Sequence, residues 1–345
     1  MPSSLAGVFR ALILSVALGV AACTPLVTQQ AGQPPTGFTG ASLQPDAVVS
    51  FDGARLGLSR WDAPGEPRAV IVAVHGMNDY GNAFNLAAPA WAQAGATTYA
   101  YDQRGFGRSP GRGVWAGEDL MVEDLRTVAA LVRARHPGVP LAIVGESMGG
   151  AVAVQAFASD RPPTADRLVL LSPAVWGWKA QPLPNKTLLW FAANFTGDRI
   201  YTPPRWLTSK VKATDNREEL MAMGRDPLMV WGARSDTLYG LVELMDRAAV
   251  SVAKAPPRTL YLYGANDQII PARAQLRAAA RAPGHVRTAY YQAGWHLLTR
   301  DLQRDRVIAD VAAFIANPDG TLPSGAPPIP TRPQAARRAG QRAGL

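Results

Sequence analysis

The chain has 345 residues, of which 48% are hydrophobic and 18% charged, and it contains a single cysteine. This length allows one large α/β domain or two smaller domains. One cysteine excludes an internal disulfide, a CxxC redox motif and a zinc site built on several thiolates. The near-average composition excludes collagen, full-length disorder and a polytopic membrane protein. The formal net charge of +9 raises the question of an anionic partner, so its distribution along the chain matters.

Residues 1–22 have the features of a secretory signal. Arg10 precedes the apolar run 11–20, which is too short to span about 30 Å of hydrocarbon as a helix. The run leads into the sequence VAAC at 20–23, which resembles a bacterial lipobox. The resemblance implies a signal peptide over 1–22, a lipid anchor on Cys23 and a place in the bacterial cell envelope. Thr24 favours the periplasmic side of the outer membrane. An ordinary secretory signal is the alternative.

Both ends of the chain lack the patterns of a packed fold. Residues 23–45 carry no charge and are rich in Pro, Gly, Thr and Gln, which predicts a flexible tether. Residues 318–345 are rich in Pro, Ala, Gly and Arg without apolar periodicity, which predicts a disordered basic tail. Arg10 and this tail together account for +4 of the net charge. The rest of the chain shows no basic stripe with interleaved aromatic residues, which argues against nucleic-acid binding.

Short apolar runs alternate with helical patterns between residues 46 and 317. The runs at 69–74 and 168–171 are apolar at every position, as in strands buried on both faces of a parallel sheet. Helices are expected over 118–135, after residue 147, and over 304–316. This alternation predicts the α/β class, with a mostly parallel eight-stranded sheet and helices on both faces. The expected strands are 47–51, 56–61, 69–75, 96–101, 141–145, 168–172, 259–264 and 286–291.

One long segment interrupts this alternation. Residues 173–255 separate two expected core strands, show no strand pattern and hold five of the nine tryptophans. Because a structureless connection of this length is uncommon in a compact domain, we expect a helical lid over 173–255, inserted into a core formed by 46–172 and 256–317. Trp176 and Trp178 are candidates for an apolar substrate pocket. Packing of a larger domain is the alternative.

The hexapeptide GESMGG at 145–150 has the pattern of a nucleophile elbow. It follows an expected strand and precedes a helical run of small residues. A sharp strand-to-helix turn needs glycines around the nucleophile and leaves the Ser147 oxygen exposed. The G-x-S-x-G pattern alone is a weak signal, and glycines that only allow close helix–strand packing are the alternative. The flanking strand and helix favour Ser147 as a nucleophile.

A serine nucleophile needs a base and an acid. His296 follows the last expected strand on a loop, and Asp267 follows the strand before it, so the order Ser…Asp…His agrees with the elbow motif. A carboxylate at Asp267 would orient the imidazole and stabilise its charged form. Asp301, five residues after His296, is a weaker rival. His75, at the end of a buried strand, is expected to support a loop.

The oxyanion formed during acyl transfer needs two backbone N–H groups directed at one point. We expect one at Met148, directly after the nucleophile and at the start of a helix. The other is expected at Met77, in the loop after the strand at 69–74, where Gly76 allows close backbone approach. An ordinary turn at Gly76 is the alternative.

These motifs together resemble the α/β-hydrolase superfamily, and within it the monoacylglycerol lipase and lysophospholipase group. The resemblance spans about residues 46–317 and implies that the stretch 102–109 is structural. Two positions depart from the group: Glu146 stands where His often precedes the nucleophile, and Leu297 stands where Glu is common. The matching motifs are HGM at 75–77, DQRGFGRS at 102–109, GESMGG at 145–150, GAND at 264–267 and GWH at 294–296.

The expected reaction is hydrolysis of a small lipid ester, a monoacylglycerol or a lysophospholipid, through an acyl-enzyme on Ser147. No metal or organic cofactor is expected, and the membrane is expected to be a partner through the lipid anchor. A broad-specificity carboxylesterase and a serine peptidase share the same catalytic residues and stay open. A non-catalytic, membrane-tethered binding protein is the third alternative.

Overall fold

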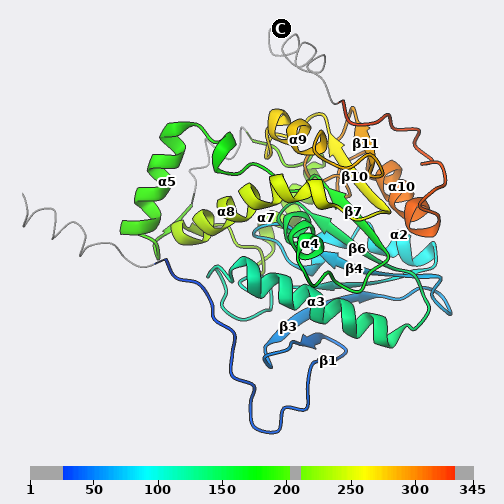
Figure 1. Cartoon of the computed structure of the whole chain (residues 1–345), viewed down its shortest axis with the longest axis horizontal. Coiled ribbons are helices and arrows are strands. Elements are labelled where there is room, and N and C mark those ends of the chain that lie inside the picture. Colours follow the sequence, from blue (N-terminus) through cyan, green and yellow to red (C-terminus); the bar gives the residue numbers. More distant parts are fainter. Residues whose placement is uncertain (1–25, 203–210, 331–345) are drawn as a thin grey trace, which may run out of the picture.

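A computed structural model describes residues 26–202 and 211–330 (Figure 1). Its centre is a sheet of nine strands in the order β1-β2-β3-β5-β4-β6-β7-β10-β11. The first three strands pair antiparallel, β3 is antiparallel to β5, and the others run parallel. The strands are β1 (Ser42–Leu43), β2 (Ala47–Val49), β3 (Arg55–Trp61), β4 (Ala69–Val74), β5 (Ala96–Tyr101), β6 (Leu141–Glu146), β7 (Arg167–Leu171), β10 (Thr259–Gly264) and β11 (Arg287–Tyr291).

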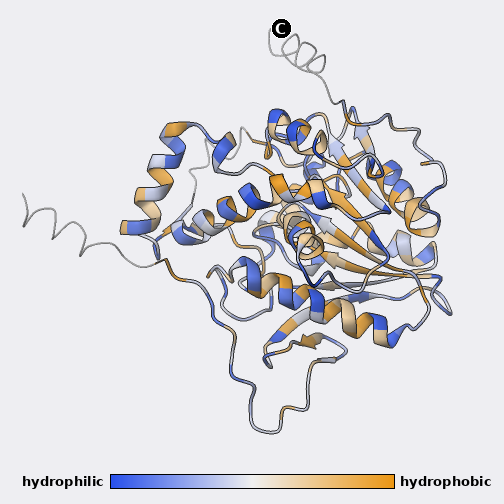
Figure 2. Cartoon of the chain, viewed as in Figure 1, coloured by the Kyte–Doolittle hydropathy of each residue, from blue (hydrophilic) through white to orange (hydrophobic). Residues whose placement is uncertain are grey.

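Helices cover both faces of the sheet, as predicted. One face packs against α3 (Glu118–Arg135), α4 (Met148–Ala158), α8 (Ser235–Ser251) and α9 (Ala272–Ala279), and the other against η1 (Gly81–Phe84), α2 (Ala88–Gln93) and α10 (Arg304–Ala316). Alternate residues of β4 enter the two cores: Val72 lies on the α3–α4 side, and Ile71 on the α2–α10 side. Every residue of β4 is therefore buried. Figure 2 shows the apolar residues on the central strands and on the inward faces of these helices.

The α/β class and the positions of the elements confirm the sequence analysis closely. Helices α3 and α10 have the expected bounds, and all eight expected strands are present with ends within two residues of the prediction. The ninth strand, β1, was not predicted. It lies in the segment expected to be a tether, and its two residues are too few to show any periodicity.

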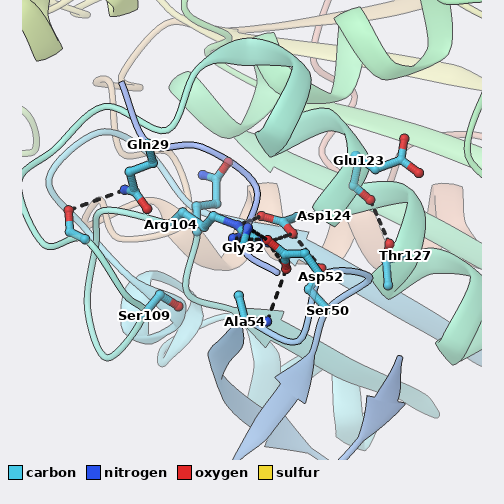
Figure 3. A network of polar contacts seen from close by, with 12 residues as sticks. Gln29, Gly32, Ser50, Asp52, Ala54, Arg104, Ser109, Glu123, Asp124 and Thr127 are labelled. Atoms are coloured by element: carbon cyan, nitrogen blue, oxygen red, sulfur yellow. Dashed lines mark hydrogen bonds and ion pairs between the residues drawn. The ribbon is translucent and has the colours of Figure 1, made fainter. Parts of the chain in front are cut away.

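The segment before β1 is not a free tether over the residues that the structure describes. Gln29 donates its backbone N–H to the carbonyl of Trp115 at 2.8 Å, and its side-chain amide to the carbonyl of Val114 at 2.8 Å. Further on, Gly32 donates its N–H to Asp52 Oδ2 at 2.7 Å (Figure 3). The described residues before β1 therefore form an extended strap, which binds the domain mainly through backbone groups. Composition alone does not predict such contacts, because every residue type carries the same backbone groups.

The expectation of a disordered tail is also corrected over its first half. Residues 318–330 run along the edge of the sheet, where Tyr290 donates its N–H to the carbonyl of Pro327 at 2.8 Å. Ile329 donates its N–H to Thr288 Oγ1 at 3.0 Å, and its side chain is buried. Because β11 is the edge strand, its outer backbone groups are not paired with another strand, and an irregular segment can form hydrogen bonds with them. Residues 331–345 lie outside the described part of the chain.

The insertion at 173–255 is mainly helical. Helix α8 packs on α4 with Leu244 and Ala248 fully buried, and the short η3 (Val252–Lys254) follows it, so this part belongs to the core. Two strands pair in the insertion, contrary to the expectation of none, because two-residue strands give no sequence pattern. The elements before α8 are η2 (Trp178–Ala180), α5 (Leu183–Phe195), β8 (Ile200–Tyr201), α7 (Arg217–Arg225) and β9 (Ala233–Arg234).

Helix α5 stands away from the sheet and exposes large apolar side chains (Figures 1 and 2). Those of Leu183, Leu188, Trp190 and Phe191 are all exposed. Within the described residues, none of the helices has both the length and the apolar content needed to cross a membrane.

Candidate active site

Ser147 occupies the sharp turn between β6 and α4. Its backbone has φ 52° and ψ −115°, a conformation that residues other than glycine rarely adopt. The neighbouring glycines allow this turn. A Cβ on Gly149 would lie 2.1 Å from the carbonyl oxygen of Val74, and one on Gly145 would lie 2.7 Å from backbone atoms of α4. The glycine pattern thus serves the close packing of strand, turn and helix and also presents Ser147.

The structure brings the three predicted catalytic side chains together. His296 Nε2 lies 2.9 Å from Ser147 Oγ, and His296 Nδ1 lies 2.9 Å from Asp267 Oδ2. All three residues are at least nine-tenths buried. These distances suit proton transfer from the serine hydroxyl to the imidazole. Asp301 does not compete for the histidine, because its Oδ2 accepts the N–H of Trp295 instead.

Asp267 is fixed by the backbone that follows β10. Its Oδ1 accepts the N–H groups of Ile269 and Ile270, at 2.8 Å and 2.9 Å, which directs Oδ2 to the imidazole. Burial opposes the charged form of His296, but the charge and hydrogen bond of Asp267, with a further contribution from Glu146, raise its pKa above the ordinary value. The site therefore favours the imidazolium that forms when Ser147 attacks.

The predicted oxyanion donors belong to two segments that meet at the serine. Met148 is the first residue of α4, where backbone N–H groups have no acceptor within the helix. Met77 belongs to the loop after β4, and this loop touches the elbow: a Cβ on Gly76 would lie 3.2 Å from Ser147 Cβ. The assignment of these two N–H groups to the oxyanion stays a prediction.

His75 supports this loop, as expected. Its Nε2 accepts the N–H of Gln103, and its Nδ1 faces the carbonyl of Gly76, both at 2.8 Å. The imidazole is buried, and its two ring nitrogens face Gly76 and Gln103 instead of Ser147. The hydrogen bond from Gln103 joins the loop after β4 to the stretch 102–109, and the contact with Gly76 lies within the loop.

The match to a family agrees with this geometry. Residues 65–303 match the family described as "Serine aminopeptidase, S33". The chain belongs to this family. A monoacylglycerol lipase from Mycolicibacterium smegmatis is 29% identical to this S33-family chain over 278 residues, which cover 79% of the chain and 96% of the relative. The monoglyceride lipase of Mus musculus is 26% identical over 292 residues, which cover 81% and 93%.

Solved structures show the same fold. A soluble variant of monoglyceride lipase from Saccharomyces cerevisiae, in complex with a substrate analog, has a TM-score of 0.67 at 18% identity and covers 84% of this chain and 99% of that one. A monoacylglycerol lipase from Paleococcus ferrophilus has a TM-score of 0.63 at 18% identity and covers 76% and 98%. These likenesses show the α/β-hydrolase fold, and the family match and the relatives make the S33-family chain a serine hydrolase.

The stretch 102–109 is structural, as the resemblance implied. Asp102 accepts the N–H groups of Gly81 and Arg108, each at 2.8 Å, and binds the Arg108 guanidinium. Arg104 lies buried between the carboxylates of Asp52 and Asp124 (Figure 3). These contacts join the strap, the antiparallel strands and α3 beside the site.

The sequence analysis missed a second buried polar group next to the triad. Arg300, four residues after His296, donates from Nη1 to Asp79 Oδ2 at 2.7 Å and from Nη2 to Glu146 Oε1 at 2.6 Å. Its Nη1 also lies 3.9 Å from Glu219 Oε1 of α7. The unusual residue before the nucleophile, Glu146, was the one signal of this cluster. Its partners come from distant parts of the sequence.

The contacts of the pocket candidates lie within the insertion. Trp178 lies against Tyr239 with ring centroids 5.0 Å apart. With Lys186, Trp190 and two further residues of α5 and α8, this pair lines a cavity of about 500 Å³ that contains no triad residue. Trp176 donates from its indole to the carbonyl of Ala180 at 3.3 Å. Their role with substrate stays a prediction.

The described residues contain no group of three His, Cys, Asp or Glu side chains placed to hold a metal ion. The polar groups that converge on Ser147 are those of a serine nucleophile and its base. The contacts of His296 with Ser147 and Asp267 are those that acyl-enzyme formation on a serine requires.

Proposed function

We propose that this S33-family hydrolase cleaves the ester bond of monoacyl lipids, monoacylglycerols or lysophospholipids. The observation that carries the proposal is the aligned Ser147–His296–Asp267 contact, in which both hydrogen-bond distances are 2.9 Å. This alignment supplies a nucleophile and a base for acyl transfer, and the curated relatives supply the substrate class.

The mechanism follows from the geometry. As Ser147 Oγ bonds to the acyl carbon, its proton passes to His296 Nε2, and the carbonyl oxygen becomes an oxyanion between the N–H groups assigned to Met77 and Met148. The ester bond then breaks, and His296 gives the proton to the leaving alcohol oxygen. Water repeats the sequence: His296 takes its proton, hydroxide attacks the acyl carbon, and Ser147 regains the proton as the fatty acid leaves.

Support for a monoacyl lipid comes from two sources. The relatives at 29% and 26% identity are named as monoacylglycerol and monoglyceride lipases and match this chain over about four-fifths of its length. The insertion beside the site is rich in apolar and aromatic side chains, and several of them are exposed on α5. Such a surface suits a long acyl chain better than a peptide.

Labelling with a fluorophosphonate probe tests the catalytic assignment. Wild type should be labelled, and Ser147→Ala should not. Labelling that is absent in wild type, or that persists in the variant, would overturn the assignment and favour a non-catalytic binding protein or another nucleophile.

A substrate panel tests the substrate class. It compares 1-monooleoylglycerol, a lysophosphatidylcholine, p-nitrophenyl esters of increasing chain length and an aminoacyl p-nitroanilide. We expect the highest kcat/KM on one of the two monoacyl lipids. Cleavage of short esters without cleavage of either lipid would indicate a broad carboxylesterase, and preference for the anilide would indicate a peptidase.

We also propose that Cys23 carries a lipid anchor, which places the enzyme in the bacterial cell envelope, on the periplasmic side of the outer membrane. The support is the lipobox-like sequence at 20–23, which lies outside the described residues. Two acyl chains on one residue suffice for stable anchoring, because each buried CH₂ contributes about 0.8 kcal/mol. Expressed in a bacterium, wild type should incorporate labelled palmitate and partition into detergent. Cys23→Ala should do neither, and equal partitioning of both would contradict the proposal.

A further inference from the structure

We propose that Arg300 is a positioning residue of this hydrolase, which holds the oxyanion loop on the nucleophile elbow while its partner Glu146 supplies negative charge beside His296. The inference rests on the proposed ester hydrolysis and adds to it two residues outside the triad. It concerns the acyl-transfer step itself and does not depend on which lipid is the substrate.

The two hydrogen bonds of Arg300 join the segments that must be aligned for attack. Nη1 binds Asp79 at 2.7 Å, two residues after the oxyanion donor assigned to Met77. Nη2 binds Glu146 at 2.6 Å, directly before the nucleophile. One planar guanidinium thus sets the distance between the oxyanion loop and the elbow. Its rigid fork suits two carboxylates better than the single flexible ammonium of lysine.

The main chain around Arg300 also makes hydrogen bonds, and both connect it to the insertion. Its carbonyl accepts the side-chain amide of Asn216 at 3.1 Å, and Leu297 donates its N–H to the carbonyl of Ala213 at 3.0 Å. These contacts fix the loop of His296 to the base of the insertion. Arg300 therefore links four segments. These are the oxyanion loop after β4, the elbow at 145–150, the loop after His296 to which Arg300 belongs, and the insertion.

The cluster contains three carboxyl groups and one guanidinium group. Arg300 faces the carboxylates of Asp79, Glu146 and Glu219, and burial raises the pKa of both glutamates. Glu146 Oε1 is satisfied, whereas its Oε2 is buried without a hydrogen-bond partner among the described residues. A buried, partly satisfied carboxylate is costly. The proposed effect of the Glu146 charge on His296 would explain why the fold keeps a carboxylate that costs stability.

Glu146 directly precedes Ser147, whose Oγ lies 2.9 Å from His296 Nε2, so its carboxylate belongs to the surroundings of the imidazole. Apart from burial and Asp267, the groups that shift the pKa of His296 include Glu146, which raises it, and Arg300, which lowers it. The other titratable groups around the cluster are His75 and Asp79 after β4, Glu219 on α7, and Asp301 after Arg300. The imidazole becomes charged during attack. A nearby carboxylate therefore stabilises the transition state, in addition to any effect on the hydrogen bonds of the resting site.

The test uses kcat and KM for p-nitrophenyl butyrate from about pH 5 to about pH 9, with active sites counted by fluorophosphonate titration. Glu146→Gln keeps the shape and removes the charge, so the acidic limb of kcat/KM should move to lower pH by roughly half a unit or more. Arg300→Met should lower kcat at least about tenfold and change KM less than about threefold. Arg300→Lys should recover part of this loss.

Arg104 provides a matched control, because it forms an equally buried double ion pair with Asp52 and Asp124 and does not contact the triad. Arg104→Met should lower the melting temperature and leave the pH profile and the kcat per active site as in wild type. The inference is overturned if Glu146→Gln keeps the wild-type acidic limb, or if Arg300→Met keeps the wild-type kcat per active site. Should Arg300→Met fail to fold, the isosteric Glu146→Gln decides by its acidic limb. A wild type that neither labels nor cleaves the ester would instead refute the proposed function.

Discussion

Asp267→Asn changes one atom of the triad and reverses a hydrogen bond. In the wild type, Oδ1 of Asp267 accepts two backbone N–H groups and Oδ2 accepts the Nδ1–H of His296. An asparagine must keep its oxygen toward the N–H groups of Ile269 and Ile270, because its NH₂ group cannot accept them. The NH₂ group then faces Nδ1 of the histidine, where it can only donate.

This reversal selects the wrong tautomer of His296. With Nδ1 as an acceptor, the ring proton lies on Nε2, 2.9 Å from Ser147 Oγ, and the imidazole can no longer take the serine proton. Loss of the correct tautomer in a Ser–His–Asp triad costs about 10⁴-fold in kcat, which corresponds to about 5.5 kcal/mol of transition-state stabilisation. The packing stays nearly unchanged, so we expect little change in the melting temperature.

The assay is kcat/KM on p-nitrophenyl butyrate with wild type, Asp267→Asn and Asp301→Asn, each checked for folding by circular dichroism. Asp301 is the control, since it binds Trp295 N–H and not the imidazole. A fall of less than about tenfold in Asp267→Asn would refute the tautomer argument. A larger fall in Asp301→Asn than in Asp267→Asn would reassign the acid.

Two further predictions concern stability. Gly149→Ala should destabilise the fold by about 3 kcal/mol or more, because the new Cβ would lie 2.1 Å from the Val74 carbonyl oxygen. Gly224→Ala in α7 is the control: with open space around it, this change should be neutral or stabilising by about 1 kcal/mol. Chemical denaturation compares the two variants, and equal effects would contradict the packing argument. Burial raises the pKa of Asp301 from 3.8 to about 7, so the folded state binds its proton more tightly and this contribution to stability is lost as pH rises from about 4 to about 7. Unfolding free energies across that range should fall less steeply in Asp301→Asn than in wild type, and parallel curves would show that Asp301 is ionised throughout.

Local sequence patterns were sufficient to predict eight of the nine strands of the sheet and the three side chains that meet at the elbow. The apolar run of β4 and the amphipathic pattern of α3 have the periods of buried strands and half-buried helices. The elbow around Ser147 needs glycines that cannot be replaced without backbone collisions. Asp267 and His296 were found because they follow consecutive core strands, whose carboxyl ends meet at one edge of a parallel sheet.

Tertiary structure alone decided the contacts made by segments without a periodic pattern. The strap around Gln29 and the segment around Ile329 bind through backbone N–H and carbonyl groups, which every residue type carries, so their composition indicated flexibility instead.

The sequence by itself determined the single lipidation candidate, Cys23, and the order of the triad along the chain, because each depends on residue type and position. Only the fold brought Arg300 to Asp79 and Glu146, which are 221 and 154 residues away in sequence. An ion pair in a protein core depends on distance and burial in three dimensions, and no local pattern records either quantity.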